Sequence, residues 1–107
     1  MKLILAIVSD DDGSRVQSGL TKNGFQVTRL ATTGGFLMSG NTTFICGCAD
    51  EKVDEAIKII GEHSKSRKEM VPASASYGVG MYTAFPVQVS VGGATIFVMN
   101  VEQFHKL

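Results

Sequence analysis

The chain has 107 residues, of which 44% are hydrophobic, and its ten Lys and Arg residues balance ten Asp and Glu residues. This length predicts a single domain spanning residues 1–107 and excludes a two-domain enzyme. A formal net charge of zero argues against a DNA- or RNA-binding protein, and the hydrophobic fraction argues against a disordered one. With two cysteines and no stretch of about 20 apolar residues, the sequence favours a cytoplasmic protein that does not span a membrane.

The first half of the chain predicts a strand, a helix and a hairpin of two strands. Residues 3–8 are apolar at every position, which is typical of a strand covered on both faces. The aspartates at positions 10–12 are candidate caps for a helix that ends at Gly24, where a left-handed residue is favoured. Alternating apolar residues then predict strands over 25–32 and 42–49, which pair as a hairpin around a glycine-bearing loop at 33–40.

The second half of the chain predicts a helix, a long loop and two further strands. Asp50 is a candidate cap for a helix with one apolar stripe, which ends near Ser66. Residues 65–85 have no clear period and are interpreted as one long loop, of a length that is usually functional or mobile. The remaining elements are, in order, a strand at 87–91, a hairpin turn at Gly92 and Gly93, and a strand at 94–99.

The order strand, helix, strand, strand, helix, strand predicts an α+β fold. It is the ferredoxin-like βαββαβ arrangement, here with an added C-terminal strand, in which both helices cover one face of the sheet. Residues 3–8 and 94–99 are nevertheless apolar on both of their faces. Since an open apolar sheet favours aggregation, we expect copies of the chain to pack sheet against sheet in a closed homo-oligomer.

The residue types of catalytic and metal sites are present, but not in the patterns that these sites need. Cys46 and Cys48 lie two apart on a predicted strand, which is typical of small packing residues, because a metal site would need further converging ligands. His63 falls at the end of a charged helix, where it is expected to be solvated. Ser74 and Ser76 have no general base or orienting acid in a recognisable motif. We therefore expect no catalytic residues, no metal and no cofactor.

The segment from Ala31 to Phe44 joins the two hairpin strands and carries Phe36 at its middle. One interpretation is an ordinary glycine hairpin whose hydrophobic residues fold back onto the sheet. The other is a binding loop, in which backbone N–H groups near Gly35 hold an anion, Phe36 stacks on a base and Asn41 hydrogen-bonds to it. Composition alone favours the ordinary hairpin.

Three motifs of the chain resemble the PII-like cyclic di-AMP receptor family, also called PstA or DarA. They read IVxDxD at residues 7–12, LATTGGFLxxGNTTFxCG at 30–47 and VGGATxFVMxVExFH at 91–105. The resemblance spans nearly the whole chain, and its central motif is long and specific. It implies a PII-like homotrimer that binds one cyclic dinucleotide at each of three subunit interfaces, performs no chemistry, and signals to a protein partner through its two loops.

The resemblance also implies which residues contact the ligand. They fall on Gln26, Thr28, Gly35, Phe36, Leu37, Asn41 and Gly47. The family usually has Asn, Arg and Gln at three positions where this chain has Gly24, Gln26 and Lys106, and Lys106 of a neighbouring subunit is one candidate for the missing positive charge. These departures leave two alternatives open: a pocket that binds another adenine nucleotide, and an interaction subunit that needs no ligand.

Overall fold

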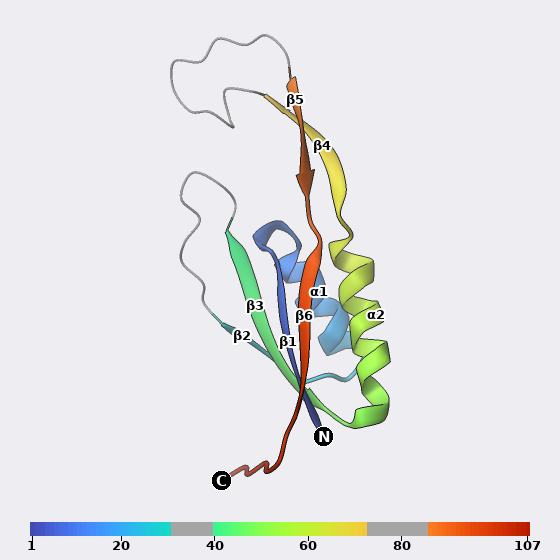
Figure 1. Cartoon of the computed structure of the whole chain (residues 1–107), viewed down its shortest axis with the longest axis vertical. Coiled ribbons are helices and arrows are strands. Elements are labelled where there is room, and N and C mark those ends of the chain that lie inside the picture. The colour runs from blue at the N-terminus through green and yellow to red at the C-terminus, as the bar shows by residue number, and fades with distance from the viewer. Residues whose placement is uncertain (31–39, 73–85) are drawn as a thin grey trace.

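The computed structural model describes residues 1–30, 40–72 and 86–107, with the backbone alone at 69–72 and 86–89. Four strands form an antiparallel sheet in the order β2-β3-β1-β6, and β4 pairs with β5 in a separate two-stranded sheet (Figure 1). The elements are β1 (Lys2–Ser9), α1 (Asp10–Lys22), β2 (Val27–Leu30), β3 (Asn41–Cys48), a 3₁₀ turn (Asp50–Lys52), α2 (Val53–Ser64), β4 (Arg67–Pro72), β5 (Pro86–Val91) and β6 (Ala94–Asn100).

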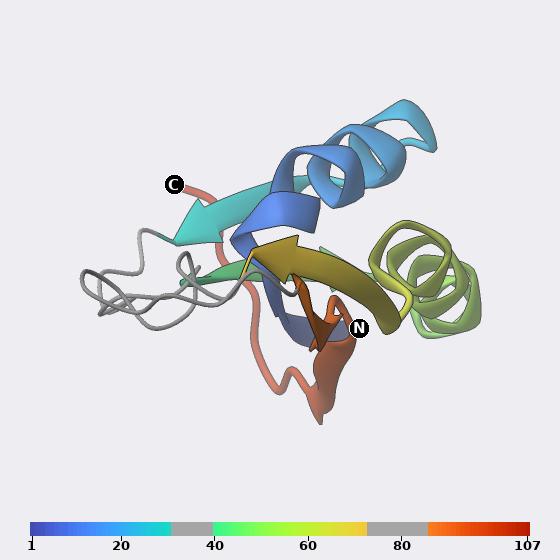
Figure 2. The ribbon, with the colours of Figure 1, turned by 90° about the horizontal axis from the view of Figure 1, so that it is seen from above.

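Both helices pack on the same face of the four-stranded sheet, as the ferredoxin-like order predicts (Figure 2). Alternate residues of β1 point into this layer, where Ile4, Ala6 and Val8 are each 1% exposed. The residues between them face the side of the sheet that carries no helix, where the partly buried β1 residues lie beside exposed Phe97 and Met99 of β6. We call this side the open face. Its apolar character is the one predicted from the sequence.

The hydrophobic core lies between the sheet and the two helices. It contains Ile4, Ala6, Val8, Val16, Leu20, Phe25, Phe44, Cys46, Ala56, Ile59 and Ile60. The helices approach closely at Gly19 of α1, where an added Cβ would lie 2.8 Å from the imidazole ring of His63 on α2. His63 is therefore half-buried between the helices, and the expectation of a solvated histidine was wrong because the missing side chain of Gly19 leaves room for the ring.

The boundaries of α1 follow local capping chemistry, although the cap is Ser9 and not one of the predicted aspartates at positions 10–12. The predicted cap at Asp50 is not observed, because neither the 3₁₀ turn nor α2 has a side-chain cap. The Ser9 hydroxyl accepts a hydrogen bond from the Asp11 backbone N–H at the start of α1. At its end Gly24 has φ +87°, the left-handed conformation expected there, and its N–H donates to the Thr21 carbonyl. Helix α2 begins after the short 3₁₀ turn and ends at Ser64, slightly before the predicted position. No helix in the described part of the chain is long and apolar enough to cross a membrane.

The structure corrects the predicted second half of the sheet. Residues 67–72 are strand β4 and not part of a loop, while 73–85 lie outside the described residues. The strand at 87–91 exists, but it pairs with β4 and not with the four-stranded sheet. Gly92 and Gly93, both at positive φ, mark the passage from β5 into β6 and not a hairpin turn. The supposedly added strand β6 is therefore the fourth strand of the main sheet, paired antiparallel with β1.

Candidate functional site

Three of the ligand contacts implied by the resemblance come together at one end of the open face. Thr28 of β2 pairs with Ile45 of β3, and Gly47 pairs with Leu3 of β1, so the strand register places these positions beside one another. Gln26 immediately precedes β2. These residues line a cavity of about 320 Å³, which we call the outer cavity; its walls are Met1, Leu3, Gln26, Thr28, Ile45, Gly47, Val101 and Phe104.

The outer cavity has apolar walls that the site prediction did not contain. Leu3 and Ile45 belong to the open face, and the alternation of their strands was the signal that could have identified them. Val101 and Phe104 lie beyond β6, where no periodicity indicates a position, and the ring of Phe104 is 64% exposed. A flat aromatic side chain beside polar Gln26 is suited to binding a nucleobase, which offers both a π-face and hydrogen-bonding edges.

Gly47 leaves space at the centre of this site. A Cβ at Gly47 would lie 3.0 Å from the terminal methyl carbon of Met1, the end of a flexible side chain. Gly47 and Gln26 also line a second cavity of about 300 Å³, which we call the inner cavity. Its walls are Asn23, Gly24, Phe25, Gln26, Gly47, Cys48, Ala49 and Lys52.

Asn41 lies at the opposite end of β3. It pairs with Ser9 and borders a separate cavity of about 310 Å³, together with Gly92 and Gly93. Six residues along a strand separate Asn41 from Gly47, which corresponds to about 20 Å. Within one chain the structure therefore does not bring Asn41 to Gln26, Thr28 and Gly47. The predicted contacts Gly35, Phe36 and Leu37 lie outside the described residues.

Hydrogen bonds fix the chain where it enters β3. The Asp10 backbone N–H donates to the Gly40 carbonyl at 3.0 Å, and the Thr42 hydroxyl donates to the Asp10 carboxylate. Arg29 of β2 donates to the same Thr42 hydroxyl at 3.3 Å, and its guanidinium carbon lies 5.9 Å from the centre of the Phe44 ring. Thr42 is 2% exposed, so these bonds satisfy a polar group inside the fold. Asp10, in the first turn of α1, thus fixes both neighbours of Asn41 in the chain, Gly40 and Thr42.

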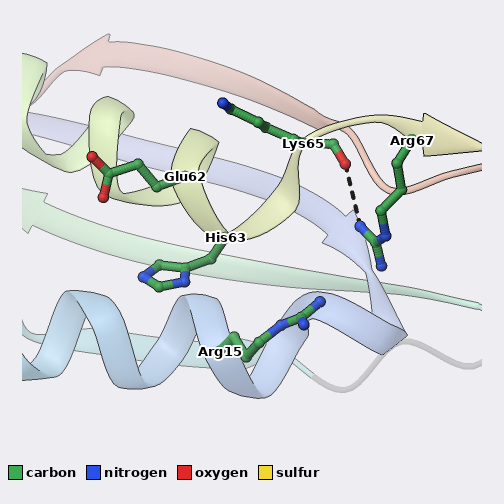
Figure 3. Close-up of a pocket in the computed structure, with 5 residues that line it drawn as sticks. All are labelled: Arg15, Glu62, His63, Lys65 and Arg67. Atoms are coloured by element: carbon green, nitrogen blue, oxygen red, sulfur yellow. Dashed lines mark hydrogen bonds between the residues drawn. The ribbon is translucent and has the colours of Figure 1, made fainter.

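A second polar cluster joins α1 to the base of β4, and Figure 3 shows two of its side chains, Arg15 and Arg67, beside the adjoining cavity. The fully buried Asp12 carboxylate accepts hydrogen bonds from the guanidinium groups of Arg15 and Arg67. Burial alone would raise the pKa of Asp12, but the hydrogen bonds and charges of the two arginines outweigh it and lower this pKa. The adjoining cavity of about 220 Å³ is lined by Arg15, Glu62, His63, Lys65 and Arg67. Because both guanidinium groups bind one buried carboxylate, this cluster has a structural role.

Neither cysteine is arranged for chemistry. Cys46 is 2% exposed in the core, and burial, with a smaller contribution from Cys48, raises the pKa of its thiol to about 11. Cys48 packs against the same core, and its pKa is also raised, by burial and then by Asp50. Both thiols are protonated at neutral pH and are poor nucleophiles and metal ligands. The prediction of packing residues is confirmed for both. In the described ranges, no three His, Cys, Asp or Glu side chains gather as metal ligands would.

Comparisons with known proteins agree with the motifs read from the sequence. The family model described as cyclic-di-AMP receptor matches residues 1–107. The crystal structure of a functionally unknown protein from Pediococcus pentosaceus ATCC 25745 is 39% identical, with a TM-score of 0.77 over 99% of this chain and 96% of that one. Such receptors bind cyclic di-AMP as a ligand and are signalling proteins, not enzymes, and no cofactor is indicated. The chain belongs to the cyclic-di-AMP receptor family.

Proposed function

We propose that this chain is a cytoplasmic, single-domain, PII-like receptor that assembles as a homotrimer and binds cyclic di-AMP at its subunit interfaces. The observation that carries the proposal is the distribution of the expected contacts on the open face. Gln26, Thr28 and Gly47 lie toward one end of β3 and Asn41 at the other; along β3, Asn41 is about 20 Å from Gly47 and about 13 Å from Ile45, the partner of Thr28. A second copy packed on the open face supplies an Asn41 end to a Thr28 end, and completes a site that one chain contains only in halves.

The apolar open face supports this assembly. Phe97 and Met99 are 52% and 41% exposed in the single chain, beside the apolar residues of β1 that also lack a covering helix. Burying them against other copies removes this area from water at about 25 cal/mol per Å², and cyclic symmetry closes the assembly. The two helices remain outside, and so does the arm formed by β4 and β5, which projects beyond the sheet (Figure 1).

In this proposal the bound nucleotide acts by changing the loops, and an unidentified protein partner reads the change. Asn41 is the first residue of β3, which is joined to α1 by the hydrogen bond between Thr42 and Asp10. The arm is joined to the same helix by Arg67 and Asp12, so both segments connect to the first turn of α1. The proposed receptor binds and signals without catalysing a reaction, and neither nucleic acid nor a membrane is involved. Net charge zero supports the absence of a general nucleic-acid partner.

The interface location is tested with mixed trimers. Asn41→Ala and Thr28→Ala each abolish or weaken cyclic di-AMP binding in homotrimers, because every interface lacks one contact. Co-expression of the two variants restores roughly one quarter of the interfaces, since a site needs Asn41 from one subunit and Thr28 from its neighbour. Isothermal titration measures the recovered stoichiometry. No recovery after subunit mixing, with a wild type that binds cyclic di-AMP, would mean that the two residues do not form a shared site between subunits.

A further inference from the structure

The outer and inner cavities adjoin at Gln26 and Gly47, which line both of them, and we call the two cavities together the groove. Their walls are otherwise made of apolar, amide, hydroxyl and small side chains. Of all the residues lining the two cavities in the described chain, Lys52 alone has a charged side chain. The Met1 ammonium group, at the edge of the outer cavity, is neutralised by the Asp50 carboxylate at 2.8 Å.

A cyclic dinucleotide needs such a charge. Each of its two phosphodiesters carries one negative charge, and Gln26 has only a neutral amide to offer. Hydrogen bonds from a cation to phosphate are stronger than those between neutral groups. A groove with one positive side chain therefore has one preferred position for a phosphodiester, at the Lys52 end of the inner cavity.

Lys52 is held in place by its backbone while its side chain is only weakly bound. Its N–H donates to the Ala49 carbonyl at 2.9 Å, which fixes the residue at the start of α2. Its ammonium group is paired with Glu55 at 3.4 Å, and the two side chains are 58% and 43% exposed. An exposed pair of this kind contributes little to stability. The ammonium group is thus able to exchange Glu55 for a better partner at little cost.

Acidic residues lie on the same turn as this lysine. Asp50 and Glu51 lie on the turn next to the inner cavity, and their charges contribute to the raised pKa of Cys48, which lines it. Because Asp50 is already paired with the Met1 ammonium group, Lys52 mainly offsets the negative charge of Glu51 beside this cavity.

We propose that Lys52 is the residue that binds a phosphodiester of the dinucleotide in this groove. On binding, the ammonium group leaves the Glu55 carboxylate and donates hydrogen bonds to a phosphate oxygen, while Gln26 and Thr28 contact the adjoining part of the ligand. The inference rests on the proposed function, and it names a specificity residue in the same subunit as Gln26. It differs from the alternative in which Lys106 of a neighbouring subunit provides the charge.

The test is isothermal titration of the full chain with cyclic di-AMP. Lys52→Gln should bind about tenfold more weakly, as expected for one charge-assisted hydrogen bond, and with a smaller dependence on salt. Lys58→Gln, an exposed lysine of α2 outside both cavities, is the matched control and should bind like the wild type. Glu55→Gln should bind at least as tightly as the wild type, because it removes the competing carboxylate. Lys52→Arg should restore most of the affinity.

The outcomes separate this inference from the proposed function. If the wild type binds cyclic di-AMP, and Lys52→Gln and Lys58→Gln bind it with equal affinity, the proposed role of Lys52 is wrong. The proposed receptor function is then unaffected. A loss confined to Lys106→Gln would do the same and assign the charge to the neighbouring subunit. Failure of the wild type to bind cyclic di-AMP would overturn both. Thermal melts of the variants should superimpose on that of the wild type, since the Lys52 side chain is exposed.

Discussion

Arg67, the first residue of β4, forms an ion pair with Asp12 in the first turn of α1, with its Nη2 atom 3.0 Å from the Asp12 Oδ1 atom. The Asp12 side chain is completely buried, whereas Arg67 is 36% exposed. A buried carboxylate persists as a charge only when it is paired and hydrogen-bonded. This pair therefore ties the base of the β4–β5 arm to the helix layer of the domain.

Replacing Asp12 by Asn should destabilise the fold markedly. Removing one partner of a buried ion pair usually costs about 3–5 kcal/mol, but here the arginines are partly exposed and can be hydrated, so we expect about 2 kcal/mol. Urea unfolding measures the change. Asp11→Asn, a neighbouring exposed acid in the same turn, is the control and should lose no more than about 0.5 kcal/mol. Equal losses for the two variants would show that the Asp12 pairing adds nothing.

The same pair predicts how stability depends on pH. The pKa of Asp12 is lowered in the folded chain, so the pair contributes fully at pH values above about 4, the usual pKa of an unfolded aspartate. This contribution is lost as pH falls through the lower pKa of the folded state. The difference in unfolding free energy between wild type and Asp12→Asn should be constant from pH 7 to about 5 and shrink below about 4. A difference that grows on acidification would contradict the assignment.

Three glycines should respond differently to alanine. Gly92 has φ +82° and an added Cβ would lie 2.5 Å from the Lys65 carbonyl oxygen, so Gly92→Ala should cost at least about 2 kcal/mol. Gly24 has φ +87° but open space around it, so Gly24→Ala should cost only about 1–2 kcal/mol of backbone strain. Gly61 lies inside α2 with nothing near its Cβ position, so Gly61→Ala should raise the free energy of unfolding by about 1 kcal/mol. Urea denaturation of the three variants checks this order, and a harmless Gly92→Ala would refute the close contact.

The strands could be predicted from the sequence where the residue pattern of a strand agrees with its pairing in the folded sheet. β1 is apolar at six successive positions, and its central place follows from that alone. β4 was missed because Arg67, Lys68, Glu69 and Pro72 have no strand-like alternation, and its partner β5 is remote in sequence. Gly92 and Gly93 resemble a hairpin turn, although the tertiary pairing of β6 with β1 makes them a bend between two sheets.

The site could be predicted in part for similar reasons. The resemblance supplied Gln26, Thr28 and Gly47, and the structure brings these three to one groove. The spacing of Asn41 and Gly47 on one predicted strand already implies that they lie about 20 Å apart. The position of Thr28 opposite Ile45 depends on the register between β2 and β3, which the spacing does not give. Phe104 lies outside the periodic segments and Lys52 at the start of a predicted helix, and the approach of both to the groove is set by tertiary packing.

An acidic residue on the open face should disrupt the assembly. Phe97→Asp places a charge among apolar residues of β1 and β6, and burying it unpaired between subunits would cost several kcal/mol. Sedimentation velocity should show a monomer for this variant and a trimer for the wild type. Ile57→Asp, on exposed α2 surface, is the control and should remain trimeric. A wild-type chain that stays monomeric at micromolar concentration would refute the proposed assembly.

The central claim, that this chain is a receptor for cyclic di-AMP, is tested most directly by isothermal titration of the wild-type protein with cyclic di-AMP, ATP, AMP and cyclic di-GMP. We predict saturable binding of cyclic di-AMP alone, with one ligand per chain and a reduced affinity for Thr28→Ala. Absence of heat with cyclic di-AMP from a folded sample, or equal binding of ATP, would contradict it.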